Sequence, residues 1–202
     1  WQRLVPAEVL AGLSIGAFGM HGSSMNLPLG RGRSPMNWSL IEGRKVFYTN
    51  LFRYDPGVDS GDIVDTFKFQ VSNRDTAETM HFKNTLAMKY LIERNIDDLV
   101  HNKYRLTPQN DALTPTYYPK RTPDDGLIDW DQDVHVIERF VRAVTRPFGG
   151  AFTFAGSEKI TVWDAQVFDL NEFGYENQPA GSVVAVFESG KFLVKCFGGL
   201  LL

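Results

Sequence analysis

Three kinds of polar side chain stand where they can do chemistry. His21 follows the apolar, glycine-rich run of residues 14–20, and imidazole is the natural proton carrier near neutral pH. Asp59 lies in a segment of turn residues and further carboxylates. Arg31 and Arg33 lie in a long loop rich in Gly, Ser and Pro, a setting that suits an anionic ligand. Taken singly, each also has a structural interpretation: a strand cap for the histidine, turn geometry for the aspartate, and solvation for the arginines.

The elements around these residues predict an α/β arrangement in the first half. The run 14–20 is typical of a strand buried on both faces of a parallel sheet, which places His21 at its carboxyl end. Ligands of open α/β sheets bind at that end. The other elements expected in this half are the end of a strand and a short helix within residues 1–10, a helix capped by Ser34 with Pro35 at its first position and a buried face at Met36, Trp38, Leu40 and Ile41, strands over 46–53 and 63–71, and a helix from the capping box Asp75–Glu78 to about Val100.

The second half reads as mostly β. Residues 101–123 contain four prolines and are expected to be irregular. Asp131 or Asp133 then begins a short helix that runs through Val144. Short strands separated by glycine turns predict a small barrel or sandwich, and they are expected at residues 151–155, 159–163, 183–187 and 191–196.

Composition excludes several classes of protein. The chain has 202 residues, 43% hydrophobic content and one cysteine, so it can bury a core but cannot form an internal disulfide, which favours a reducing, cytoplasmic setting. No spacing of metal ligands, signal peptide or membrane-spanning run is visible. From residue 121 onward, seven basic residues stand against twelve acidic ones, a formal charge of −5. A surface that grips nucleic acid would normally be basic, so this half argues against such a partner.

Read together, the motifs resemble the formyltransferase family, which includes methionyl-tRNA formyltransferase and sugar N-formyltransferases. Three strings in the first half carry the resemblance: His21-Gly22-Ser23, then Gly30-Arg31-Gly32-Arg33-Ser34-Pro35-Met36-Asn37-Trp38, then Gly57-Val58-Asp59-Ser60-Gly61-Asp62-Ile63. Two strings in the second half agree independently: Arg121-Thr122-Pro123-Asp124-Asp125-Gly126-Leu127-Ile128-Asp129-Trp130, and Arg146-Pro147-Phe148-Gly149-Gly150-Ala151-Phe152. The strings come in the family's order and cover nearly the whole chain.

The resemblance implies a fold, a donor and a set of site residues. The implied fold is a partial Rossmann-like parallel-sheet domain over residues 1–105, a linker over 106–130 and a small open barrel of the OB type over 131–202. The implied formyl donor is 10-formyltetrahydrofolate, without a metal. His21 and Asp59 match the family's catalytic His and Asp, and Gly57, Val58 and Asp59 its folate-binding segment. Ser23, Asn26, Arg31 and Arg33 are further candidates for contacts to substrate.

The sequence departs from the family pattern in two respects. Gly19 stands where the family carries a catalytic Asn, two residues before His21, and Asn26 in the nearby loop is the candidate to replace it. The family's first βαβ segment does not precede Trp1, so we expect a longer natural protein, a homodimer, or a second chain that supplies the missing strands.

The expected activity is formyl transfer to a small primary amine, with the amino group of a nucleotide-linked sugar as the preferred acceptor. Methionyl-tRNA is the second candidate acceptor, and formylation of a peptide-synthetase starter unit or of hydroxyornithine is also open. The alternative from another class is a non-catalytic module that binds folate or a nucleotide and has lost the chemistry. Gly19 favours that alternative, whereas His21 and Asp59 oppose it.

Overall fold

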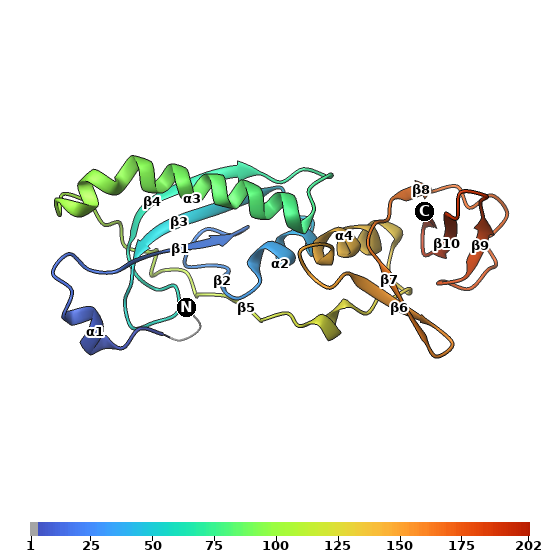
Figure 1. The fold of residues 1–202 in the computed structure, drawn as a ribbon, viewed down its shortest axis with the longest axis horizontal. Coiled ribbons are helices and arrows are strands. Elements are labelled where there is room, and N and C mark those ends of the chain that lie inside the picture. Colours follow the sequence, from blue (N-terminus) through green and yellow to red (C-terminus); the bar gives the residue numbers. More distant parts are fainter. Residues whose placement is uncertain (1–3) are drawn as a thin grey trace. The chain divides into compact units, whose positions relative to one another are not determined.

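The structure is a computed structural model, and it describes residues 4–202. The chain divides into two compact units, shown in Figure 1. The N-terminal unit comprises the described residues up to 75 together with 79–121, and the C-terminal unit comprises 76–78 and 122–202. The domain limits expected from the sequence, at residues 105 and 130, remain a prediction.

The N-terminal unit is built on a three-stranded sheet. Its strands, in the spatial order β1-β3-β4, are β1 (Phe18–Ser23), β3 (Val46–Arg53) and β4 (Ile63–Gln70). Both pairings are antiparallel. Parallel pairing occurs separately, between the two-residue strands β2 (Arg31–Gly32) and β5 (Tyr117–Tyr118). The chain is therefore mixed α/β.

The expectation that the strand before His21 lies in a parallel sheet is wrong. That strand begins at Phe18 rather than at residue 14, and His21 lies within it rather than at its end. This strand pairs antiparallel with β3, in the register His21 opposite Asn50. The apolar glycine-rich run was misleading because its glycines leave room for side chains of the β3 end rather than marking burial on both faces: a Cβ on Gly19 would meet the ring of Tyr54, and one on Gly16 would meet the guanidinium of Arg53.

One long helix covers one face of this sheet. Helix α3 (Ala77–Val100) ends where the sequence predicts, and Figure 1 shows it lying along the strands. Its Leu91 and Leu99 pack with Leu51 of β3 in the core, and Met20 of β1 packs against this cluster. Because side chains alternate along a strand, Gly19, His21 and Ser23 face away from α3.

Two short helices complete the N-terminal unit. Helix α1 (Ala7–Ala11) follows Pro6 as expected. The strand end expected within residues 1–10 has no counterpart at residues 4–10, and residues 1–3 lie outside the described residues. Helix α2 (Pro35–Ile41) begins after Ser34, whose side chain makes no capping bond. Of its expected apolar face only Leu40 is buried, together with the polar Asn37 and Ser39, so that part of the expectation is wrong.

The C-terminal unit combines one helix with two antiparallel sheets. Asp133 caps helix α4 (Val134–Val144) by accepting the backbone N–H of His135, as its sequence position predicts. The elements around it are the 3₁₀ turn η1 (Pro123–Gly126), the hairpin β6 (Ala151–Ala155) and β7 (Glu158–Val162), and a sheet in the order β8-β11-β10-β9 of Val167–Asp169, Gly199–Leu201, Phe192–Cys196 and Val183–Val186. The four expected strands are present, and β8 and β11 were not predicted. The hairpin and the sheet are separate, so the barrel of the OB type remains a prediction.

Candidate active site

His21 and Asp59 lie together in the N-terminal unit. The imidazole of His21 is 7% exposed, and its Nδ1 is 3.4 Å from Oδ2 of Asp59, whose side chain is 21% exposed. The other ring nitrogen, Nε2, is 2.8 Å from the carbonyl oxygen of Gly30. Both ring nitrogens therefore face oxygen acceptors, and only a doubly protonated imidazolium can donate to both.

Asp59 lies in the loop between β3 and β4. One of its carboxylate oxygens is hydrogen-bonded, and, within the described part of the chain, the other is not. Oδ2 also accepts the backbone N–H of Gly32, at 3.0 Å. Among the described residues, no hydrogen bond to Oδ1 is found. Asp59 has a positive φ of 49°, an uncommon conformation for a residue other than glycine, which surrounding contacts must hold in place. The pair can thus offer one free carboxylate oxygen as a proton acceptor.

Arg31 and Gln109 form a hydrogen bond with each other, and Gln109 also bonds to the loop that carries Asp59. The guanidinium of Arg31 is 8% exposed, and it donates to Oε1 of Gln109 at 2.7 Å and to the hydroxyl of Tyr117 at 3.2 Å. Nε2 of Gln109 donates to the carbonyls of Asp59 and Gly61, each at 2.8 Å. Gln109 could not be singled out from the sequence, because it lies in a proline-rich stretch typical of a connector, and its only local signal is the neighbouring Pro108.

The other predicted residues do not join the pair. Ser23 is fully buried, and its hydroxyl accepts the N–H of Met25 within the following loop. Asn26 is exposed, and its side chain accepts the N–H of Leu27. Arg33 is exposed on the same loop, and no contact to either His21 or Asp59 is found for its side chain among residues 4–202.

The expected folate-binding segment is open to solvent. Gly57 and Val58 are exposed, Val58 to 39%, although the N–H of Gly57 is taken by the side chain of Asp55. An open cavity of about 260 Å³ adjoins this segment and is lined in part by Tyr54, Ser60 and Gly61. The segment can therefore receive a ligand along its exposed backbone, beside Asp59.

The structure explains why position 19 carries no side chain. A Cβ on Gly19 would stand 2.3 Å from both Cζ and the hydroxyl oxygen of Tyr54, which is closer than atoms can approach. The Tyr54 phenol therefore occupies the space above the strand, two residues from His21 and on the same face. No contact between Asn26 and this position is found among the described residues, so the replacement expected from the sequence remains untested.

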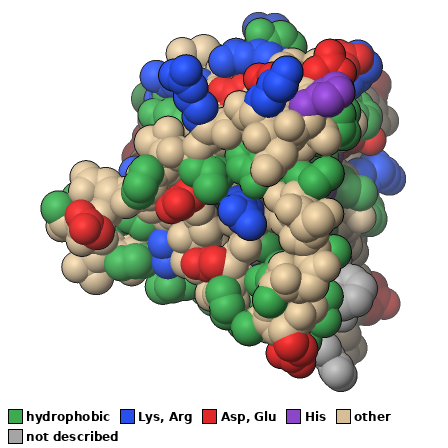
Figure 2. Space-filling view, turned by 90° about the vertical axis from the view of Figure 1, so that its left-hand side faces the viewer, with side chains coloured by type: hydrophobic (Ala, Val, Ile, Leu, Met, Phe, Trp, Pro, Cys, Tyr) green, Lys and Arg blue, Asp and Glu red, His purple; other side chains and the backbone are tan. Residues whose placement is uncertain are grey.

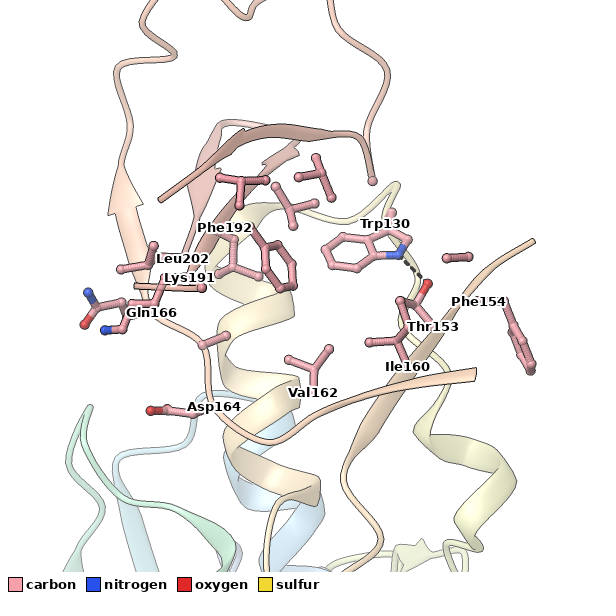
Figure 3. Close-up of a pocket in the computed structure, with 18 residues that line it drawn as sticks. Trp130, Thr153, Phe154, Ile160, Val162, Asp164, Gln166, Lys191, Phe192 and Leu202 are labelled. Carbon is pink, nitrogen blue, oxygen red and sulfur yellow. Dashed lines mark hydrogen bonds between the residues drawn. The ribbon is translucent and has the colours of Figure 1, made fainter. Parts of the chain in front are cut away.

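A second cavity lies in the C-terminal unit, apart from these residues (Figure 3). Its volume is about 630 Å³, and the side chains of Trp130, Ile160, Val162 and Phe192 project into it. Its lining includes neither His21 nor Asp59, and it is largely apolar, with Asp164 and Lys191 as its charged residues. In the part of the chain that the structure describes, no cluster of three or more His, Cys, Asp or Glu is arranged to hold a metal ion. None of the described helices is long and apolar enough to cross a membrane.

Comparison with known proteins identifies the fold. Residues 120–202 match the family described as formyl transferase, C-terminal domain. HypX from Aquifex aeolicus in complex with tetrahydrofolic acid is 18% identical with a TM-score of 0.75, over 100% of this chain and 33% of that one. An N-formyltransferase from Helicobacter canadensis, in complex with folinic acid and dTDP-3-aminofucose, is 19% identical with a TM-score of 0.70, over 100% and 70% of the two chains. Methionyl-tRNA formyltransferase from Clostridium thermocellum is 20% identical with a TM-score of 0.65, over 96% and 73%.

The chain thus spans about a third of the length of the HypX chain that it matches. Together the matches confirm the resemblance to the formyltransferase family: residues 120–202 match the model of its C-terminal domain, and the chain as a whole has the fold of the formyltransferases that it matches.

Proposed function

We propose that this chain performs formyl transfer from 10-formyltetrahydrofolate to a primary amine, with the amino group of a nucleotide-linked sugar as acceptor. The observation that carries the proposal is the pairing of His21 with Asp59 at 3.4 Å, because these residues come from separate motifs 38 positions apart. A fold that had lost the chemistry would have no reason to keep an imidazole and a carboxylate opposed in this way.

The chain's own residues supply acid-base chemistry. Bound 10-formyltetrahydrofolate would supply the formyl carbon, which bonds to the amine nitrogen as its bond to the folate nitrogen breaks, while a proton passes overall from the amine to the folate nitrogen. Oδ1 of Asp59 is the group that accepts this proton, because it is open while Oδ2 is engaged. His21 holds the carboxylate in place and stabilises its negative charge.

The donor side of the site fits a folate. Gly57 and Val58 present an exposed stretch of backbone directly before Asp59. A pterin-like ring carries several hydrogen-bonding edges and an apolar face, which such a stretch can receive. The HypX structure in complex with tetrahydrofolic acid and the Helicobacter canadensis structure with folinic acid support a folate as donor.

Four observations favour a small anionic acceptor over tRNA. The chain from residue 121 onward carries a formal charge of −5, which disfavours docking of RNA. On the face seen in Figure 2, basic and acidic side chains are interspersed and no continuous basic surface appears. Arg33 is exposed on the loop after the His21 strand, where its guanidinium is available to the phosphates of a nucleotide. The Helicobacter canadensis N-formyltransferase in complex with dTDP-3-aminofucose supports an acceptor of this kind.

The test is formyl transfer by the complete natural protein that contains residues 1–202. Nucleotide-linked amino sugars and methionyl-tRNA are offered as acceptors, with folate binding measured separately by calorimetry. We expect turnover of an amino sugar that is lost in His21→Gln and Asp59→Asn. Asp62→Asn is the matched control, because Asp62 lies in the same segment but contributes its backbone carbonyl, to the N–H of Arg53.

Each other result leads to a different conclusion. Turnover of methionyl-tRNA alone would replace the sugar acceptor in the proposal. Folate binding without turnover of any acceptor would contradict catalysis and support the binding module. Equal activity of Asp59→Asn and the unchanged protein would exclude the acid-base role of the pair.

A further inference from the structure

We propose that Gln109 is a positioning residue for Asp59, and that its side-chain amide holds the backbone turn that presents the carboxylate to His21. The catalytic part of this inference rests on the proposed function. Its structural part stands on hydrogen bonds within the N-terminal unit.

Both polar atoms of the Gln109 amide form hydrogen bonds, one with the turn that carries Asp59 and the other with Arg31. Nε2 donates to the carbonyls of Asp59 and Gly61, each at 2.8 Å, so the two residues that flank Ser60 are held by one group. Oε1 accepts from Arg31 at 2.7 Å. A hydrogen bond from a charged donor is stronger than a neutral one, and it polarises the amide toward better donation from Nε2.

The backbone conformation of this turn is unfavourable and needs hydrogen bonds to stabilise it. Asp59 has a φ of 49°, in the left-handed region that residues with a Cβ rarely adopt. Residues in this region persist when several contacts fix them, and they concentrate at functional sites. Here the backbone carbonyl is fixed by Gln109 and the carboxylate by Gly32, so main chain and side chain are held independently.

These contacts close a ring around the proposed catalytic pair. The carbonyl of Gly30 faces His21, the N–H of Gly32 donates to Asp59, and the Arg31 side chain between them donates to Gln109. Nε2 of Gln109 in turn donates to the backbone carbonyl of Asp59. Gln109 is 50 residues from Asp59 and 78 from Arg31 in sequence, so it joins two distant loops.

A role in stability alone makes a different prediction from a role in positioning. If Gln109 only stabilised the unit, its loss would lower resistance to unfolding and leave the folded protein active. If it positions Asp59, the folded protein itself changes: the carboxylate leaves the N–H of Gly32, and the chemical step slows while acceptor binding persists.

The experiment compares Gln109→Ala and Gln109→Glu with Asn110→Ala in the complete natural protein. Asn110 is the matched control, because it lies next to Gln109 and, among residues 4–202, the one hydrogen bond found for its side chain is the local one from the N–H of Ala112. Gln109→Glu keeps an acceptor for Arg31 but loses the donor to the two carbonyls. The structural readout is hydrogen exchange of the Gly32 amide by NMR, and the catalytic readout is kcat and KM for formyl transfer.

We expect both Gln109 variants to raise the exchange rate of the Gly32 amide by about tenfold or more. We expect kcat to fall by about 100-fold, because a displacement of about 1 Å of a catalytic group has effects of this size, with KM for the amine nearly unchanged. Asn110→Ala should match the unchanged protein in all three quantities.

The outcomes separate this inference from the proposed function. If the unchanged protein does not transfer formyl groups, the proposed function fails, while Gly32 exchange still tests whether Gln109 holds Asp59. Unaltered Gly32 exchange in both Gln109 variants overturns the inference, whatever the activity. Full activity of Gln109→Glu also overturns it, because the contact with Arg31 would then suffice.

Discussion

Gly61 gives the sharpest test of how the candidate site is attached to the sheet. It is buried, and a Cβ added to it would lie 1.6 Å from the carbonyl oxygen of Arg53, the last residue of β3. This neighbour is backbone and cannot swing aside as a side chain could. Gly61→Ala therefore has to push the whole loop that carries Asp59 away from the end of the strand.

The cost follows from what the displaced loop loses. Overpacking of this kind costs about 1–3 kcal/mol. The hydrogen bond from the N–H of Arg53 to the carbonyl of Asp62, at 2.9 Å, lies next to the new methyl group, and its loss costs a further 0.5–1.5 kcal/mol, roughly. We expect Gly61→Ala to lower the free energy of unfolding by about 2–4 kcal/mol and to abolish most formyl transfer.

The assay is urea-induced unfolding followed by circular dichroism, with Gly12→Ala as control. Gly12 has ordinary helical dihedrals, and its added Cβ would meet only contacts of 3.6 Å or more. That variant should leave the free energy of unfolding unchanged or raise it by up to about 1 kcal/mol. If Gly61→Ala unfolded within about 0.5 kcal/mol of the unchanged protein, the close packing of the loop on β3 would be refuted.

Three further predictions concern single side chains. Asp59→Asn should lower kcat by about 10²–10⁴-fold in single-turnover experiments and leave urea-induced unfolding nearly unchanged, because it removes a proton acceptor without removing volume. Burial raises the pKa of the Cys196 thiol to about 11, so its alkylation by iodoacetamide at pH 8 should be about 100-fold slower in the folded than in the urea-unfolded protein. Burial alone would raise the pKa of Asp75, but hydrogen bonds, first that from Lys83, lower it overall, so its carboxylate stabilises the fold above about pH 4 and this contribution is lost on further acidification. Lys83→Met should therefore lower the free energy of unfolding at pH 7 by about 1–2 kcal/mol and flatten its fall between pH 5 and 2, which urea unfolding at several pH values will measure.

Much of the secondary structure could be predicted because its signals are local. Strand 46–53, the helix ending at Val100 and the cap at Asp133 follow from alternation, helix-start residues and capping chemistry within a few positions of each residue. The direction of the sheet could not be read from the strand before His21 alone, because an apolar run looks the same in either pairing. The nine-residue connection over 54–62 indicates only that β3 and β4 pair antiparallel, and it does not set the direction of β1.

The candidate site likewise has a part that could be predicted from local sequence and a part that could not. Residue type and immediate neighbours are enough to predict that His21, Asp59 and Arg31 stand in motifs suited to acid-base chemistry and to anions. The hydrogen bond from Gln109 to the carbonyl of Asp59, and the position of the Tyr54 ring above Gly19, became visible only in the folded chain. These contacts join segments between 35 and 78 positions apart, so they depend on which backbones the fold brings within hydrogen-bonding or van der Waals distance, and no local pattern encodes that.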